Sequence, residues 1–436
     1  MGFMVNIRTI NSSEITEENV EEFIPRTSSK LKDLQYDVME IVNEVIINGD
    51  QALIDFTEKF DKVSLKKGDI MVTKEEIEEA YENIDNDLLE ALRFAKKNLI
   101  TFHEAQVREE WYIDIIDGVK AGQVARPIDS VGLYIPGGKA IYPSTVLMAA
   151  APAKVAGVKD IILCSPPQQN GTIAFEIIVA ANEFGIDKMF KVGGVQAIAA
   201  MAHGTETIPK VLKVVGPGNK WVNAAKQLLS NIIAIDNPAG PSEIMIIADN
   251  SANYEYVLID LISQLEHDPD NMAAIITDSE DLLEKIEQHL DLYIQNSKRK
   301  EIIESAINNS LLIRAENMEE CIRVSNIIAP EHVEILTTNP KQILKKINNA
   351  GAIFLGSNSP VPLGDYSAGT NHILPTGGYA KTYSGLNTLD FIKLIDVLEC
   401  SGKGLKNLSS SAMKIAEYEK LFAHRESIQK RLEDKS

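Results

Sequence analysis

Two side chains in the second half of the chain could bind a metal ion together. Gln264 and His267 stand three residues apart at the end of the segment 254–267, whose apolar residues recur at helical spacing. Residues three apart on a helix face the same direction, so this segment offers an amide oxygen and an imidazole nitrogen side by side. Taken alone, such a pair is most often part of a solvated helix face, and further residues are needed to make a metal site.

Suitable further residues occur in two later segments. Glu331 and His332 are adjacent and follow Pro330, and Asp365 lies in the glycine-containing segment 364–369. An imidazole titrates near neutral pH and a carboxylate can activate water, so the Glu-His pair could assist two different proton transfers. With Asp365 as a ligand, the set predicts a metal site that carries its own acid and base. The chain contains neither HExxH nor CxxC, so a metalloprotease or a structural zinc knuckle lacks its usual support.

Two glycine-rich turns follow segments that we expect to be strands. Residues 136–138 (Pro-Gly-Gly) follow Ile135, and residues 216–219 (Gly-Pro-Gly-Asn) follow Val215. In open α/β sheets, ligands bind in loops at the carboxyl ends of parallel strands. The chain has no GxGxxG fingerprint, so these segments could equally be tight turns and nothing more.

Short apolar segments alternate with helical ones from residue 130 onward. This alternation is typical of parallel sheets that are covered on both faces. It predicts two sets of five strands: 131–135, 161–164, 189–192, 211–215 and 232–235, then 244–248, 273–277, 311–313, 333–336 and 352–355. We therefore expect an α/β fold with two similar doubly wound parallel-sheet, incomplete Rossmann-like domains and small helical segments at both ends.

The expected domain boundaries follow from these patterns. Residues 1–25 form a helical N-terminal segment, and 130–242 form one α/β domain. The mostly helical residues 26–129 join residues 243–385 in a discontinuous second α/β domain that carries most of the metal-binding and catalytic residues. Residues 386–436 form a polar helical tail with a thin apolar stripe, which is expected to pack on another surface.

Bulk properties exclude several classes of function. The net charge is −20, from 43 basic and 63 acidic residues, and such a surface repels nucleic acid and anionic membranes. The three cysteines, Cys164, Cys321 and Cys400, are odd in number and widely spaced, as in a reducing compartment. The apolar stretch 145–158 is interrupted by Pro152 and Lys154 and is too short to span a membrane. These features predict a cytoplasmic protein.

Eight segments resemble, in the same order, those of the L-histidinol dehydrogenase family. They are VGLYIPGG (131–138), VGGVQAIAA (192–200), GPGN (216–219), PAGPSE (238–243), SQLEHDP (263–269), APEHVEI (329–335), GDYSAGTNHILPT (364–376) and EKLFAH (419–424). A weaker match, FHEAQ at 102–106, extends the resemblance towards the N-terminus. Each segment is short, but eight in order are specific.

The resemblance implies an enzyme that binds one Zn²⁺ per subunit and oxidises L-histidinol to L-histidine with NAD. This reaction passes through L-histidinaldehyde and forms the last two steps of histidine biosynthesis. Oxidation of an alcohol to an acid removes four electrons, so two NAD molecules must each accept one hydride. The metal would bind the imidazole and amine of the substrate and thereby position it.

The resemblance also implies a role for individual residues. The zinc ligands, which would also contact the substrate, are Gln264, His267, Asp365 and His424. The NAD contacts are Tyr134, Gln196 and Asn219, and the additional substrate contacts are Ser242, His332 and Glu419. His332 would remove the hydroxyl proton, and Glu331 would activate the water that attacks the aldehyde. No role is implied for His372.

The family also exchanges its C-terminal segment between subunits, which predicts a homodimer whose tail completes the partner's site. The main alternative is a zinc-dependent hydrolase on an α/β fold, which would likewise use Glu331 to activate water but would leave the two glycine-rich turns unexplained. A catalytically inactive binding protein on the same fold would lack a ligand or the Glu-His pair, and all of them are present. Since no cysteine lies in a matched segment, we reject covalent cysteine catalysis.

Overall fold

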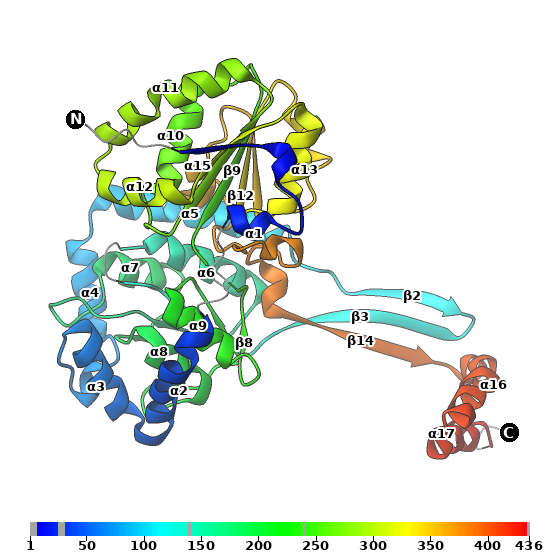
Figure 1. Ribbon diagram of the computed structural model, residues 1–436. Helices are drawn as coiled ribbons and strands as arrows, with labels where there is room; N and C mark the ends of the chain where they lie inside the picture. Colours follow the sequence, from blue (N-terminus) through cyan, green and yellow to red (C-terminus); the bar gives the residue numbers. More distant parts are fainter. Residues whose placement is uncertain (1–6, 25–30, 138–140, 239, 434–436) are drawn as a thin grey trace.

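A parallel five-stranded sheet forms the lower half of the molecule in Figure 1. The computed structural model describes residues 7–24, 31–137, 141–238 and 240–433. In spatial order the strands are β6 (Met189–Phe190), β5 (Asp160–Cys164), β4 (Ser130–Tyr134), β7 (Lys213–Val215) and β8 (Ala234–Ile235). Numbered within the domain, this order is 3-2-1-4-5, which is the doubly wound order of a dinucleotide-binding sheet without its sixth strand. All five predicted strands are confirmed.

A second sheet with the same strand order forms the upper half of the molecule. It contains β11 (Leu311–Arg314), β10 (Met272–Thr277), β9 (Glu243–Ala248), β12 (His332–Leu336) and β13 (Ala352–Leu355). A sixth strand that was not predicted, β1 (Arg8–Asn11), pairs in parallel with β11. The prediction of two similar doubly wound sheets is confirmed, whereas the N-terminal segment is a strand followed by the short helix α1 (Val20–Phe23).

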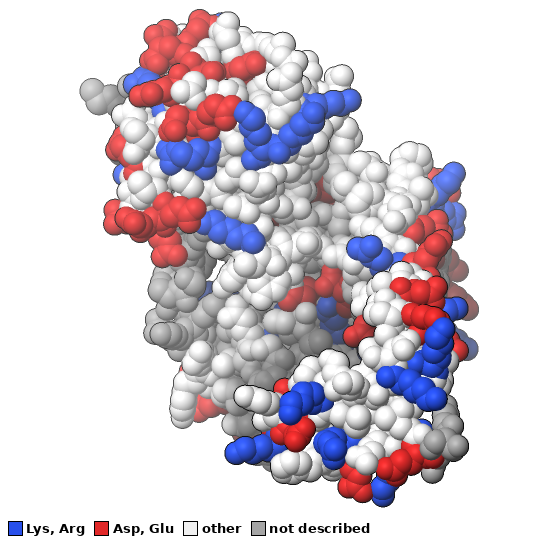
Figure 2. Space-filling view, turned by 90° about the vertical axis from the view of Figure 1, so that its right-hand side faces the viewer, with Lys and Arg blue, Asp and Glu red and all other residues white. Residues whose placement is uncertain are grey.

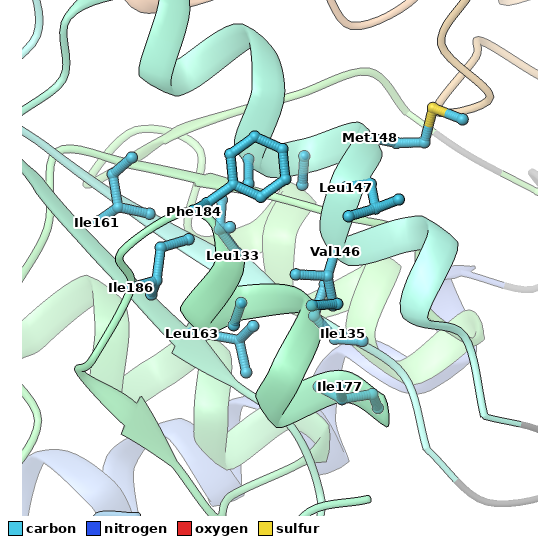
Figure 3. Packing of buried hydrophobic residues seen from close by; sticks show 14 of the residues in the cluster. Leu133, Ile135, Val146, Leu147, Met148, Ile161, Leu163, Ile177, Phe184 and Ile186 are labelled. Atoms are coloured by element: carbon cyan, nitrogen blue, oxygen red, sulfur yellow. The ribbon is translucent and has the colours of Figure 1, made fainter. Parts of the chain in front are cut away.

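The five-stranded sheet is covered on both faces, and helices from the N-terminal region supply much of the cover. One hydrophobic core packs α4 (Lys74–Asn83), α5 (Asn86–Glu104), α6 (Pro143–Ala156) and α7 (Phe175–Glu183) against the sheet (Figure 3). The core on the other face contains α2 (Leu31–Asn48), α3 (Asp50–Asp61), α8 (Gly194–His203) and α9 (Lys220–Leu228).

The prediction that residues 26–129 belong with the second sheet is therefore wrong for the helices α2 to α5. Their apolar faces are buried against the five-stranded sheet and its helices, as the contacts of α2 with α8 and α9 and of α5 with α6 indicate. A helical periodicity shows that one face is buried but does not identify the surface that covers it. Helix α5 also reaches the other domain, where Asn98 Nδ2 donates to the carbonyl of Ser367 over 2.8 Å.

The helices of the six-stranded sheet follow it in sequence. One face packs against α10 (Tyr254–Leu265), α11 (Glu280–Asn296), α12 (Lys300–Ala306) and α15 (Val361–Tyr366). The other face packs against α1, α13 (Met318–Ile328) and the chain around α14 (Pro340–Leu344). Both faces of the sheet are therefore buried, which explains why its strands are almost continuously apolar.

An antiparallel arm projects from the body (Figure 1). It consists of β2 (Trp111–Ile116), β3 (Val119–Pro127) and β14 (Ile392–Cys400), and it ends in α16 (Gly402–Tyr418) and α17 (Phe422–Glu433). The prediction of a purely helical tail from residue 386 is wrong, because nine residues of it pair with β3. The arm exposes large apolar side chains on its strands and helices, including Ile113 and Tyr418, which a chain in isolation leaves uncovered.

Charged side chains are mixed on the face that carries the arm. In Figure 2, Lys and Arg lie in separate groups among acidic residues and form no continuous basic surface on this face. Among the described residues, no helix is long and apolar enough to cross a lipid bilayer.

Candidate functional site

The Glu331–His332 pair lies where two central strands of the six-stranded sheet begin. Glu331 immediately precedes β12, and His332 is its first residue and pairs with Ile244 of β9. Ala329 adopts a left-handed conformation, with φ of 50°, which turns the chain sharply before Pro330. Neighbouring residues in an extended strand point to opposite faces. The irregular entry instead lets both side chains lie in one buried site.

Several short contacts define the geometry of this pair. Glu331 Oε2 accepts a hydrogen bond from the Glu243 backbone N–H over 3.0 Å and lies 3.7 Å from His332 Nδ1. His332 Nδ1 lies 3.3 Å from the carbonyl oxygen of Glu243, to which it can donate. His332 Nε2 lies 3.6 Å from Asp365 Oδ1 and has no hydrogen-bond partner in the described part of the chain. The imidazole therefore stands between two carboxylates, with one nitrogen available.

Burial and mutual charge shift the pKa values of these groups. Burial raises the pKa of Glu331 to about 7, although His332 and the Glu243 N–H act in the opposite direction. Burial alone would lower the pKa of His332, but the charges of Glu331 and Asp365 outweigh it and raise the pKa to about 9. Asp365 is also buried, yet His332 holds its pKa below the ordinary value. The three residues form one coupled proton-binding unit.

Two of the four predicted zinc ligands are close together here, since Asp365 belongs to this unit and His267 interacts with the charges of Asp365 and His332. Gln264 lies in the last turn of α10 and His267 just beyond the helix, which ends two residues earlier than predicted. Asp365 lies near the end of α15 and is close enough to act on the charge of His267. Among the described residues, no cluster of three or more His, Cys, Asp or Glu side chains has metal-binding geometry. The predicted ligand set differs from such a cluster in two ways. Gln264 is not one of these residue types, and His424 lies in the arm.

The two site residues that are predicted in the tail, Glu419 and His424, lie far from this unit within the same chain. His424 is in α17 and Glu419 follows the last residue of α16, and both are exposed at the tip of the arm (Figure 1). The chain therefore does not bring its own His424 to Asp365.

Two residues without a predicted role belong to the same neighbourhood. Asn271 Nδ2 donates to the carbonyl of Gln264 over 2.9 Å, and its Oδ1 accepts from the N–H of Ser242 over 3.2 Å. His372 Nδ1 donates to the carbonyl of Asp365 over 2.9 Å, while its Nε2 lies 3.3 Å from Thr145 Oγ1. Asn271 follows SQLEHDP by two positions, but a lone asparagine in a loop gives no signal of this bridging role.

The three predicted NAD residues surround the point where the strand order of the five-stranded sheet reverses. Tyr134 ends β4, Asn219 follows β7, and Gln196 lies in the first turn of α8. Ligands bind at such reversal points, beyond the carboxyl ends of the strands. The Glu331–His332 pair, in contrast, lies at the amino ends of β9 and β12. The two sites therefore use opposite edges of two similar sheets, which the general rule for α/β sheets does not predict.

Each of these three side chains has a defined local role. The hydroxyl of Tyr134, which is buried, accepts from the N–H of Gly194 over 3.1 Å, and burial raises its pKa to about 12. Asn219 Oδ1 caps α9 through the N–H groups of Trp221 and Val222, which leaves its amide nitrogen available. Gln196 Oε1 is buried without a hydrogen-bond partner among the described residues. Gly138, part of the first predicted turn, lies outside the described residues.

The cysteines occupy positions that suit packing. Cys164 lies in β5 and Cys321 in α13, and each is buried within a hydrophobic core. Burial raises the pKa of both thiols, so they stay protonated and poorly nucleophilic. Cys400 is exposed at the end of β14 in the arm.

A cavity of about 970 Å³ lies beside the edge strand β13. It is lined mainly by apolar residues of β13, α15 and the end of α5, including Phe102, Phe354 and Leu363. None of the predicted site residues lines it, so its size does not identify the catalytic site. It lies on the body next to Gly364 and therefore close to Asp365.

Two further buried carboxyl groups lie close together. They belong to Glu334, two residues beyond His332 in β12, and to Asp260 of α10. Burial and the charge of Asp260 raise the pKa of Glu334 well above its ordinary value, so Glu334 is protonated at neutral pH. A raised pKa in the folded state contributes stability at low pH that is lost as the pH rises through that value. We expect Glu334→Gln to gain stability relative to the unmodified protein between about pH 5 and pH 9, because the amide cannot ionise. Thermal unfolding of both proteins at several pH values across this range tests the prediction. A difference in Tm between the two proteins that does not change with pH would contradict it.

Comparison with known proteins identifies the family. A family model described as histidinol dehydrogenase matches residues 24–432. Histidinol dehydrogenase of Methanocaldococcus jannaschii is 46% identical over 420 residues, which cover 96% of this chain and 97% of that protein. That of Clostridium acetobutylicum is 47% identical over 392 residues, or 90% of each chain. The crystal structure of histidinol dehydrogenase from Elizabethkingia anophelis is 41% identical and superimposes with a TM-score of 0.94 over 98% of both chains.

Proposed function

Because the chain belongs to the histidinol dehydrogenase family, we propose that it oxidises L-histidinol to L-histidine in two NAD-dependent steps at a zinc site completed by a second subunit. Membership of the family supports an oxidoreductase of histidine biosynthesis, and it gives no support to the alternative of a hydrolase. The observation that carries the two-step chemistry is the line of contacts from Glu331 through His332 to Asp365.

In the first step, His332 accepts the hydroxyl proton of histidinol through Nε2. Bound NAD would supply the oxidant for this step by accepting the hydride of the carbinol carbon, which would leave the aldehyde. Nε2 is the nitrogen without a hydrogen-bond partner, whereas Nδ1 is directed at the carbonyl of Glu243. That carbonyl fixes the orientation of the ring, as a base for proton transfer requires.

In the second step, Glu331 accepts a proton from the water that adds to the aldehyde carbon. His332 then accepts a hydroxyl proton of the resulting hydrate, and a second NAD would supply the oxidant by accepting its hydride, which would give the carboxylic acid. A pKa of about 7 suits Glu331 to this role, because a base works best when its pKa is near the working pH. The hydrogen bond from the Glu243 N–H holds one carboxylate oxygen in place and leaves the other for water.

The residues that would hold zinc are Gln264, His267 and Asp365 of one chain and His424 of the other. Their nitrogen and oxygen atoms suit Zn²⁺, and the largely buried Asp365, whose pKa lies below its ordinary value, is an anionic group that a cation would balance. Bound zinc would hold the substrate by its imidazole and amine and, by neutralising Asp365, lower the pKa of His332 towards its ordinary value.

The residues that would hold NAD are Tyr134, Gln196 and Asn219. The unpaired Oε1 of Gln196 supports this assignment, because a buried acceptor without a partner is costly unless a ligand supplies a donor. Helix α8 begins two residues before Gln196 and α9 begins directly after Asn219, and the amino ends of helices favour the negative charge of a pyrophosphate.

The arm supports a homodimer with shared sites. Its strands and helices expose Trp111, Leu398, Tyr418 and Phe422 to solvent, which is costly for so extended a structure in a single chain. A two-fold dimer would bury these side chains against the partner and could bring His424 and Glu419 to the partner's Asp365.

Formation of NADH on addition of histidinol tests the oxidation directly. The account predicts an increase in NADH absorbance that depends on both histidinol and NAD. Release of a hydrolysis product without NADH would instead favour the hydrolase.

Removal of the metal should abolish turnover while the fold persists. None of Gln264, His267 and Asp365 is a member of the four hydrophobic cores of the two sheets, so we expect the fold not to require the metal. Activity and thermal unfolding would be measured before and after chelation and after Zn²⁺ is restored. Full activity in the chelated protein, or loss of its cooperative unfolding transition, would contradict this expectation.

A further inference from the structure

A buried ion pair holds both backbone polar groups of one glycine at the predicted NAD site. Gly216 follows β7, and its N–H donates to Asp236 Oδ2 over 2.7 Å. Lys226 Nζ donates to the carbonyl oxygen of Gly216 over 2.9 Å. Lys226, in the last turn of α9, and Asp236, just after β8, also form an ion pair, and their side chains are only 3% and 2% exposed.

Gly216 is a position where the backbone could easily take another conformation. Its φ is 122°, a value that side chains disfavour, and a Cβ there would lie 2.0 Å from the carbonyl oxygen of Tyr134. Only glycine fits against the end of β4, but glycine also has the greatest freedom to move. The hydrogen bond that Asp236 accepts from Gly216 and the one that Lys226 donates to it remove that freedom by fixing the peptide groups on both sides of the residue.

Stability alone is a weak reason for this pair. Removing two charges from water costs free energy that their attraction often fails to recover, so apolar residues would serve packing equally well. The pair does give a defined geometry to the segment between Tyr134 and Asn219. Farther along the same turn, Asn223 Nδ2 donates to the carbonyl of Gly218 over 2.9 Å, so the whole turn is held from α9 and β8.

We propose that Lys226 and Asp236 are positioning residues for the dinucleotide: they fix the turn 216–219 in the conformation that binds NAD. This role rests on the proposed function, since it assumes that NAD binds at Tyr134 and Asn219. The pair serves NAD and not histidinol, because Ser242, Gln264 and the catalytic pair belong to the other sheet.

The test removes both charges together, so that neither is left buried without a partner. In Lys226→Met/Asp236→Asn, the new asparagine can still accept from the Gly216 N–H. The carbonyl oxygen of Gly216, however, loses its charged donor. A matched control is Lys213→Met/Asp390→Asn. Lys213 is buried in β7 three residues before Gly216 and donates to Asp390 over 2.8 and 3.3 Å, away from the turn.

The measurements are KM for NAD, KM for histidinol and Tm, all on the zinc-loaded protein. We expect the Lys226/Asp236 variant to raise KM for NAD about 10-fold or more, because a hydrogen bond from a charged donor is lost, with KM for histidinol changed less than about 2-fold. The control variant is expected to lower Tm without this selective change. Lys226→Arg, which keeps a charged donor, should stay closer to the unmodified protein. If the double variant does not fold, Asp236→Asn alone is measured for the same selective change.

Two results would overturn the proposal and leave the proposed function intact. One is an unchanged KM for NAD in a folded variant. The other is an equal rise in KM for NAD in the variant and in the control, which would indicate general destabilisation. If the unmodified protein neither binds nor reduces NAD, the proposed function fails and the positioning role fails with it.

Discussion

Glu331→Gln is expected to slow the oxidation of histidinaldehyde by roughly 10²–10⁴-fold, the usual loss when a positioned base is removed. Glutamine has almost the same shape and can still accept from the Glu243 N–H, so the fold and the position of His332 should persist. It cannot accept a proton from water. The oxidation of histidinol to the aldehyde needs no water, so that step should be damaged less. His332→Asn should impair the alcohol step more clearly than Glu331→Gln does, because His332 accepts a proton in both oxidations.

The two steps are separated by supplying histidinol or histidinaldehyde and following single turnovers. Glu334→Gln is the matched control, since Glu334 is a buried carboxyl group two residues along the same strand and is already neutral near pH 7. That control should keep both steps. An equal loss on both substrates in Glu331→Gln would exclude Glu331 as the residue that activates water.

Mixing two inactive variants, His332→Asn and His424→Ala, is expected to restore activity. If tails are exchanged, a heterodimer has one site with both substitutions and one fully intact site. Random exchange of subunits makes about half of the dimers heterodimers, so roughly a quarter of all sites should recover. The reason is geometric: within one chain, His424 lies at the tip of the arm and His332 lies in the body.

A mixture of His332→Asn with Glu331→Gln provides the control for this experiment. Both substitutions lie in the body, so every site of every dimer carries one of them and no activity should return. Subunit exchange would be verified by mass spectrometry of differently tagged chains. Exchanged samples of His332→Asn and His424→Ala that remain inactive would show that each site is built from a single chain.

Much of the fold can be predicted from the sequence, and the failures share a physical cause. Ten of the eleven strands of the two parallel sheets are predicted, because a strand buried on both faces is a short apolar run whatever it packs against, and the exception is the edge strand β1. The arm was missed because β2 and β14 are exposed along nearly their whole length, so their apolar residues follow no one-sided pattern. The helices α2 to α5 were predicted as helices but assigned to the wrong sheet, since amphipathicity does not identify the partner surface.

The candidate site was predicted only as a set of separate residues. Neither periodicity nor spacing indicates that Ala329 turns left-handed and brings Glu331 and His332 into one site at the amino end of β12. The bridging role of Asn271 and the contact of His372 with the Asp365 carbonyl depend on tertiary structure in the same way. The pair Lys226 and Asp236 was not singled out, because a lysine in an amphipathic helix is normally expected at the surface.

The yield of NADH per histidinol tests the central claim most directly. With limiting histidinol and excess NAD, the account predicts two NADH for each histidinol consumed and the appearance of histidine, with no NADH formed after the metal is chelated. One NADH per histidinol with accumulation of the aldehyde, or an undiminished yield from the chelated protein, would contradict the two-step oxidation at a zinc site.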